Sequence, residues 1–206
     1  MLKRHHSDYK YAIYGGSFDP IHRAHVALAY YATRELDLDE LYFVPAYVNP
    51  FKQGRNTTPG EDRFKMIESI LHYDKSFRVS DCEIMKEGPS YTIETLKHFS
   101  DNIEGELHFL CGWDSLLEID HWYHGEEILR NYTLVTARRP GSDDSDGMAK
   151  IKEFREKYET LVYVLDFPPM DVSSTAVRNN VKEGKPINEL VLPEVEDYIR
   201  EHNLYK

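Results

Sequence analysis

His22 and His25 lie three residues apart at the end of a glycine-rich segment, GGSFDPIHRAH, which begins at Gly15. Imidazole rings can donate hydrogen bonds to phosphate oxygens and stabilise charge that develops on them. If a helix begins near residues 20–21, both rings lie on one face of its first turn. The N–H groups of Gly15 and Gly16, with the positive end of that helix, would then form a phosphate cradle facing the two rings.

A second segment with phosphate-binding chemistry, VSSTAVR, begins at Val172. Ser173 or Ser174 can cap the helix that follows, and the free N–H groups of that helix would face the same ligand. Arg178 lies about one turn further along, and the planar fork of its guanidinium suits phosphate oxygens. Because the two segments are far apart in the sequence, the fold must bring them together.

Short apolar runs that alternate with helical patterns would position these groups. Strands are expected at residues 11–14, 41–44, 77–79, 107–111, 134–137 and 161–165. Helices are expected at residues 26–36, 58–73 (opened by a capping box at Thr58), 90–99 (capped by Ser90), 113–130 with a break near 120–122, 149–158, 174–181 and 193–202, and residues 141–147 are expected to be a loop. Strands spaced by helices imply right-handed crossovers. The expected class is therefore α/β, a doubly wound, mostly parallel sheet with helices on both faces, whose ligand lies beyond the carboxyl ends of the strands.

The composition is that of an ordinary globular chain. The 206 residues are 41% hydrophobic and 30% charged, and no apolar run is long enough for a membrane span or a signal peptide. The net charge of −11 argues against a nucleic-acid surface. We expect residues 1–206 to form one domain, with residues 1–10 as an N-terminal tail, and we expect neither a membrane nor a nucleic acid as a partner.

Cys82 and Cys111 are the only cysteines, and both lie in apolar, strand-like runs. Buried free thiols and a cytoplasmic location are therefore expected. His121 and His124 are also at helical spacing, but no cysteine or set of carboxylates completes a metal shell near them. No metal site made of protein ligands is predicted.

The candidate groups offer positive charge and N–H donors, without a nucleophilic elbow, a Cys–His pair or a carboxylate cluster for two metals. This set suits transfer of a nucleotidyl group, because the attacking phosphate of a second substrate is already mostly ionised near neutral pH. Catalysis would then consist of positioning and of stabilising charge on the α-phosphate and the departing pyrophosphate.

The segment GGSFDPIHRAH resembles the signature of the nucleotidyltransferase superfamily, and it is most similar to the pattern GG-[ST]-FDPIH-x-x-H of bacterial nicotinate mononucleotide adenylyltransferases. The segment VSSTAVR is similar to the family's ISST-x-[IV]-R, whereas Ala24 stands where the family normally has Gly. The resemblance extends over nearly the whole chain from Tyr11. It implies adenylyl transfer from ATP to nicotinate mononucleotide, giving nicotinate adenine dinucleotide and pyrophosphate, a step of NAD biosynthesis.

The resemblance also implies roles for individual residues. His22 and His25 would contact the phosphates of ATP, and Arg178 would hold the leaving pyrophosphate. The residues implied in ATP binding are Gly15, Gly16, Ser17, Phe18, Gly112, Asp114, Ser173, Ser174 and Thr175. Mg²⁺ would be carried mainly by the ATP phosphates, since this ion usually keeps several waters and few protein ligands.

Three further segments resemble the family's acceptor site: PAYVNPFK from Pro45, SYTIETL from Ser90 and DHWY from Asp120. The mononucleotide-binding residues that they and the helix after Pro59 imply are Lys52, Arg63, Tyr91, Thr92, Trp122 and Tyr123. Without the resemblance, four of the assigned residues have simpler interpretations: Lys52 as a solvated loop residue, Arg63 in a surface ion pair with Glu61 or Asp62, Trp122 as a core residue and Asp114 as a helix cap.

Two other functions stay open. One is a sister adenylyltransferase that uses nicotinamide mononucleotide or phosphopantetheine, and the other is a nucleotide-binding module without turnover. The sequence also leaves open whether the chain forms a homo-oligomer.

Overall fold

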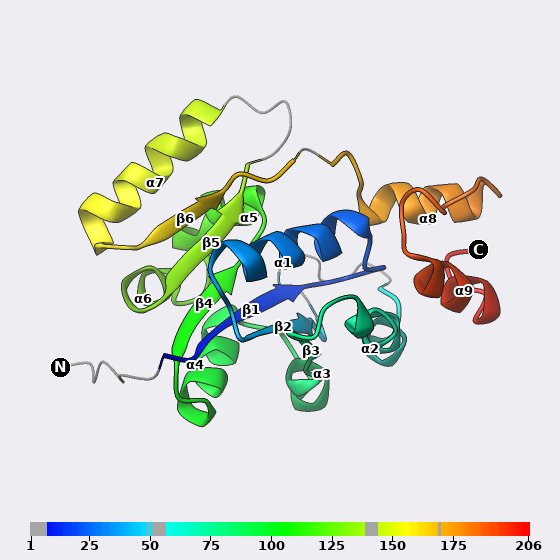
Figure 1. Ribbon diagram of the computed structural model, residues 1–206, viewed down its shortest axis with the longest axis horizontal. Coiled ribbons are helices and arrows are strands. Elements are labelled where there is room, and N and C mark those ends of the chain that lie inside the picture. Colours follow the sequence, from blue (N-terminus) through cyan, green and yellow to red (C-terminus); the bar gives the residue numbers. More distant parts are fainter. Residues whose placement is uncertain (1–7, 49, 51–56, 139–143, 169) are drawn as a thin grey trace.

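The computed structural model describes residues 8–48, 50, 57–138, 144–168 and 170–206 (Figure 1). Within these residues six strands form one sheet: β1 (Lys10–Gly16), β2 (Glu40–Pro45), β3 (Phe77–Val79), β4 (Glu106–Leu110), β5 (Thr133–Ala137) and β6 (Val162–Leu165). Their order is β3-β2-β1-β4-β5-β6, and every neighbouring pair is parallel. The predicted doubly wound α/β class is confirmed.

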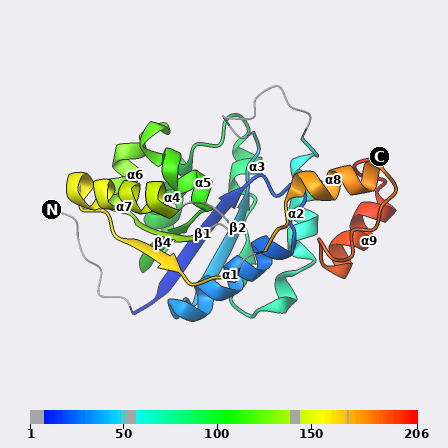
Figure 2. The same ribbon diagram turned by 90° about the horizontal axis from the view of Figure 1, so that it is seen from above.

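Helices cover both faces of the sheet because both faces of its strands are apolar. Ala12 and Tyr14 of β1 pack in one buried cluster, and Tyr11 and Ile13 pack in the other. The first face carries α1 (Arg23–Glu35), α2 (Gly60–Glu68), α8 (Ser174–Lys182) and α9 (Pro193–Glu201), and the second carries α4 (Thr92–Asn102), α5 (Trp113–Glu118), α6 (Gly125–Asn131) and α7 (Asp144–Tyr158). Helices α8 and α9 lie together with the C-terminus at one end of the molecule (Figures 1 and 2).

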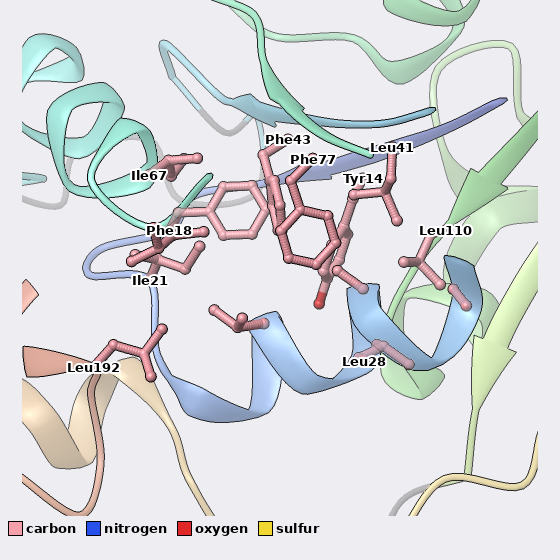
Figure 3. Close-up of a cluster of buried hydrophobic side chains, with 14 of the residues drawn as sticks. Tyr14, Phe18, Ile21, Leu28, Leu41, Phe43, Ile67, Phe77, Leu110 and Leu192 are labelled. Atoms are coloured by element: carbon pink, nitrogen blue, oxygen red, sulfur yellow. The ribbon is translucent and has the colours of Figure 1, made fainter. Parts of the chain in front are cut away.

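Aromatic rings fill the first cluster beneath the turn that follows β1 (Figure 3). Phe18 is 2% exposed, and its ring makes edge contacts with Tyr14 and Phe43 at centroid distances of 5.3 and 5.8 Å. Edge-to-face packing of this kind is favourable beyond the area that it buries. The turn therefore rests on a rigid aromatic floor.

Strand order reverses between β1 and β4, which are neighbours in the sheet although β2 and β3 separate them in the sequence. The chain leaves β1 toward one edge of the sheet and later builds the other edge from β4 onward. In such sheets the loops at the carboxyl ends of the two central strands diverge and leave a crevice. The fold thus places the glycine turn after β1 opposite Cys111 and Gly112, which follow β4.

Several local predictions were wrong. Thr58 does not cap α2, because its side chain bonds to Tyr205 and the N-cap residue is Pro59. Helix α2 begins at Gly60 and ends at Glu68, with a 3₁₀ turn at Leu71–Tyr73. Ser90 does not cap α4, which has Tyr91 at its N-cap. Helix α7 begins at Asp144, inside the segment expected to be a loop.

The expected strand-like run at Cys82 is also wrong. Cys82 begins a short helix, α3 (Cys82–Lys86), and is half-buried, whereas Cys111 is buried as predicted. The hydroxyl oxygen of Ser80 accepts a hydrogen bond from the Cys82 N–H at 3.3 Å, which turns the chain out of the sheet after β3. No helix among the described residues is long and apolar enough to cross a membrane.

We expect Gly125→Ala to lower the free energy of unfolding by about 3 kcal/mol, the upper range for overpacking. A Cβ atom at Gly125 would lie 1.8 Å from the carbonyl oxygen of Ile119, so the backbone of α6 or of the 3₁₀ turn η3 (Ile119–His121) must move. Urea denaturation measures the change. Gly112→Ala is the matched control, since a Cβ atom there meets nothing within 4 Å. Equal urea midpoints for the two variants would contradict the packing of α6 against η3.

Candidate active site

The two histidines meet at the start of α1. The helix begins at Arg23, before the helical run expected from residue 26 and after residues 20–21, where a start would have put both rings on one helix face. His22 is its extended N-cap residue (φ −140°). The N–H group of His22 donates to Nδ1 of His25 at 3.3 Å, and the two rings stack with centroids 3.6 Å apart. The imidazoles therefore lie together because of the cap geometry and not because they share a helix face.

His22 is buried, with 7% of its surface exposed, and burial lowers its pKa to about 4. Its ring is therefore neutral at pH 7. The buried Nδ1 atom has no hydrogen-bond partner of good geometry among the described residues. The His22 side chain faces the His25 N–H, the contact of a capping box at the start of α1.

A cavity of about 570 Å³ opens between the ends of β1 and β4, at the reversal of strand order. Its volume lies in the range of small-molecule sites. The residues predicted for the site that line it are Gly15, Gly16, Ser17, His25, Tyr91, Thr92, Asp114, Trp122 and Tyr123. The structure thus brings the glycine turn after β1 and most of the predicted acceptor residues to one cavity.

The second segment that was predicted to bind phosphate, which begins at Val172, packs beside the glycine turn that follows β1. Ser173 caps α8 as predicted, accepting a hydrogen bond from the Ala176 N–H at 3.2 Å. The Ser174 hydroxyl donates to the carbonyl oxygen of Pro20 at 2.9 Å. Arg178 donates to the carbonyl oxygen of Asp19 at 2.7 Å. The N-terminus of α8 therefore attaches directly to the loop between the glycine turn and His22.

A family model and named relatives both match most of the chain. Residues 13–180 match the cytidylyltransferase-like family. A protein of Clostridium beijerinckii with the name "Probable nicotinate-nucleotide adenylyltransferase" is 38% identical over 202 residues, covering 96% of this chain and 99% of its own length. A Clostridium novyi protein with the same name is 35% identical over 198 residues, covering 96% and 99%.

The chain belongs to the nicotinate-nucleotide adenylyltransferase family. The structure of the Plasmodium falciparum nicotinic acid mononucleotide adenylyltransferase complexed with NaAD has the same fold, with a TM-score of 0.76 over 96% of this chain and 97% of that one. The two sequences are 22% identical, so the similarity to this structure bears on the fold alone.

Some residues predicted for a nicotinate-nucleotide adenylyltransferase site do not line the cavity. Those within the described residues are Phe18, His22, Arg63, Gly112, Ser173, Ser174, Thr175 and Arg178, and Lys52 lies outside the described residues. The Phe18 ring is buried beneath the turn and contacts the His25 ring edge-on at 5.0 Å. Its side chain therefore packs against the ring of His25 in the core and does not reach the cavity.

Arg63 is buried, which neither of the two interpretations from the sequence predicted. It is 1% exposed, so the surface ion pair considered from the sequence does not form. Its guanidinium donates to the carbonyl oxygens of Thr58 at 2.8 Å, Ser17 at 2.8 Å and Tyr47 at 3.5 Å. Burial lowers the pKa of the guanidinium, and the nearby Asp19 carboxyl opposes that change. Arg63 thus links the glycine turn after β1 to the loop that follows β2.

The side of the cavity where the predicted acceptor residues lie is aromatic. The Tyr91 and Tyr123 rings lie 4.4 Å apart between centroids, and Trp122 is half-buried with its ring 6.3 Å from Phe109. Trp122 packs against the second core cluster and also lines the cavity, so the core interpretation and the binding interpretation both describe part of its surface. Flat apolar walls of this kind suit an aromatic ring.

Two residues that line the cavity, Glu83 and Ser90, were not predicted from the sequence to belong to the site. The Thr95 hydroxyl donates to Glu83, and burial raises the pKa of the Glu83 carboxyl. The Ser90 hydroxyl oxygen accepts the Tyr47 N–H at 2.9 Å, and the Ser90 N–H donates to the Val48 carbonyl oxygen at 2.9 Å. An acidic residue within an apolar run was the one available signal for Glu83.

Proposed function

We propose that this family member transfers the adenylyl group of ATP to nicotinate mononucleotide, with His22, His25 and Arg178 stabilising the transferred charge. Adenylyl transfer in NAD biosynthesis is the activity for which its relatives are named. One observation carries the residue assignment. Arg178 and the stacked histidines converge on the same loop beside the cavity at the reversal of strand order.

In the proposed reaction, an oxygen of the mononucleotide phosphate attacks the α-phosphorus of ATP. A new P–O bond forms as the bond from the α-phosphorus to the bridging oxygen breaks, and pyrophosphate leaves with that electron pair. The attacking phosphate is already ionised near neutral pH, so no general base is needed. Neutral His22 can contribute a hydrogen bond only, whereas the Arg178 guanidinium supplies full positive charge to the leaving group.

The acceptor would lie against the aromatic side of the cavity. Tyr91 and Thr92, which line this wall, form the N-cap and first residue of α4. The N-terminus of a helix presents unpaired N–H groups and a positive partial charge, so it favours a carboxylate over an amide. We therefore propose that the pyridine carboxylate of nicotinate mononucleotide binds at the start of α4.

A divalent metal accompanies ATP in reactions of this kind, and we propose Mg²⁺ for this role. The described residues contain no group of three or more His, Cys, Asp or Glu side chains that could hold a metal ion. Mg²⁺ keeps several waters when it binds to phosphates. The ATP phosphates would therefore carry it, with few ligands from the protein.

We further propose that residues 1–206 form one domain that acts in the cytoplasm on small molecules. Both core clusters share the single sheet, and β1 begins at Lys10, the last residue of the expected tail. Cys82 and Cys111 are free thiols, as is usual in a reducing compartment.

Pyrophosphate release with each of three acceptors tests the proposed function. The assay contains ATP and Mg²⁺ with nicotinate mononucleotide, nicotinamide mononucleotide or phosphopantetheine. We expect kcat/KM for nicotinate mononucleotide to exceed that for the amide at least about tenfold, equivalent to about 1.4 kcal/mol in transition-state binding.

The other outcomes identify the alternatives. Release with nicotinamide mononucleotide or phosphopantetheine alone would assign the chain to a sister activity. A rise in melting temperature with ATP but no pyrophosphate with any acceptor would favour a binding module.

A further inference from the structure

We infer that Tyr205, next to the last residue of the chain, is a positioning residue for the phosphate-binding loop and acts through Asp19. This inference deepens the proposed function and rests on it. The Tyr205 hydroxyl donates to Oδ1 of Asp19 at 2.7 Å, although the two residues are 186 positions apart. Asp19 belongs to the loop that joins the glycine turn to His22.

Asp19 is the point at which three distant segments hold this loop. The residue is 7% exposed. Besides the Tyr205 contact at Oδ1, its Oδ2 accepts the Thr58 N–H at 3.4 Å, and its carbonyl oxygen accepts from Arg178 at 2.7 Å. The bond from Tyr205 is the shortest contact to the carboxyl group, and the Thr58 contact is at the long end of the hydrogen-bond range. Tyr205 is therefore the main anchor of the Asp19 side chain.

The conformation of the C-terminal turn is consistent with a specific placement of Tyr205. Asn203 and Tyr205 have φ angles of 54° and 64°, in the left-handed region that is unfavourable for residues other than glycine. The Leu204 N–H donates to the Ile199 carbonyl oxygen at 3.1 Å, which fixes this turn onto the end of α9. Such backbone conformations persist where surrounding contacts determine them.

The contacts that hold the loop come from residues that do not line the cavity. Arg63 binds the carbonyl oxygen of Ser17, and Tyr205 binds the side chain of Asp19. Burial and the adjacent Asp19 carboxyl raise the pKa of the Tyr205 hydroxyl, which therefore stays a neutral donor. Ser17 and His25 meanwhile line the cavity. A small displacement of such groups can reduce the rate of a positioned reaction up to about a hundredfold.

Tyr198 on α9 provides a control close to the C-terminal turn. Its hydroxyl donates to Oδ1 of Asp62 on α2 at 2.9 Å, so it also joins a tyrosine of the C-terminal region to a carboxylate. Neither Tyr198 nor Asp62 lines the cavity or bonds to the loop between β1 and α1 in the described structure. Tyr198→Phe therefore removes a tyrosine–carboxylate bond without removing an anchor of the loop.

The test compares Tyr205→Phe with Tyr198→Phe in the full chain. ATP affinity is measured by calorimetry, and kcat and both KM values are measured by pyrophosphate release. We expect Tyr205→Phe to raise the Kd for ATP about fivefold and to lower kcat about tenfold, with the KM for nicotinate mononucleotide within about twofold of wild type. Tyr198→Phe should leave these constants unchanged and lower the melting temperature less than Tyr205→Phe does, because Asp62 is less buried than Asp19.

A Kd for ATP in Tyr205→Phe within about twofold of that in Tyr198→Phe would overturn the inference. In an Asp19→Ala background, the effect of Tyr205→Phe on the Kd should shrink to what its remaining contact with Thr58 contributes, and an undiminished effect there would also overturn the inference. The Kd comparison does not depend on the acceptor. It therefore separates failure of this inference from failure of the proposed function, in which the wild-type chain binds ATP and releases no pyrophosphate.

Discussion

Replacing His25 with alanine is expected to lower kcat at least about a hundredfold, the range for loss of one donor that stabilises transition-state charge. His25 is the histidine whose side chain lines the cavity. Its Nδ1 accepts the His22 N–H at 3.3 Å, so in the neutral ring the proton resides on Nε2, and Nε2 is the ring atom that can donate to a phosphate oxygen in the proposed reaction. Phe18 and Tyr14 hold the ring in place through edge contacts at 5.0 and 6.0 Å.

Pyrophosphate release under saturating ATP and acceptor measures this effect. His25→Gln is the informative companion variant, because its amide can donate from about the position of Nε2 and should recover part of the lost rate. His98→Ala, which removes an exposed histidine from α4, is the control for loss of an imidazole elsewhere. Near-normal turnover in a folded His25→Ala variant would contradict the assignment of the catalytic site.

Arg63→Met is expected to lower the free energy of unfolding by at least about 3 kcal/mol. The substitution leaves the part-buried carbonyl oxygens of Ser17, Thr58 and Tyr47 without their shared donor, and a group that is left without a partner away from water costs about 1–3 kcal/mol. Burial of the guanidinium itself carries a desolvation penalty, which the variant relieves. The expected loss is therefore smaller than the sum of three such terms.

Urea denaturation measures the stability of Arg63→Met against Lys65→Met. Lys65 lies on the same helix, is half-exposed and pairs with Glu68 at the surface, so its loss should change stability by less than about 1 kcal/mol. Arg63→Lys should also be destabilising, because an ammonium group cannot reproduce the fork that reaches three carbonyl oxygens. A stable Arg63→Met variant with a raised KM for nicotinate mononucleotide would instead support the direct contact that the sequence predicts.

The parts of the fold that depend on local patterns were predictable from the sequence. The buried runs at β1, β4 and β5 are continuous and apolar, as parallel strands covered on both faces must be. Helix α3 was missed because its five residues are too few to show a helical period. The start of α1 was misplaced because the sequence does not reveal the extended backbone of His22.

The candidate site was predictable where a motif carries it and not where long-range contacts define it. Gly15, Gly16, His25 and Thr92 reach the cavity as expected, because each lies at the end of a strand or the start of a helix. The position of Arg63 could not be predicted, since its partner Ser17 is 46 residues away and accepts through a backbone carbonyl. Carbonyl oxygens are the same in every residue, so no residue type reveals such a contact.

The two helical layers that cover the sheet hold different parts of the proposed site. The loop between β1 and α1 packs with α8 in the first core cluster, whereas Tyr91 and Trp122 pack against the second. Asp114, which the resemblance assigns to ATP binding, also lies in the second layer, on α5. A lineage could therefore acquire a new acceptor through changes around Tyr91 and Trp122 while it keeps the loop, α8 and Asp114, so descent with a changed substrate would require drift in only part of one layer.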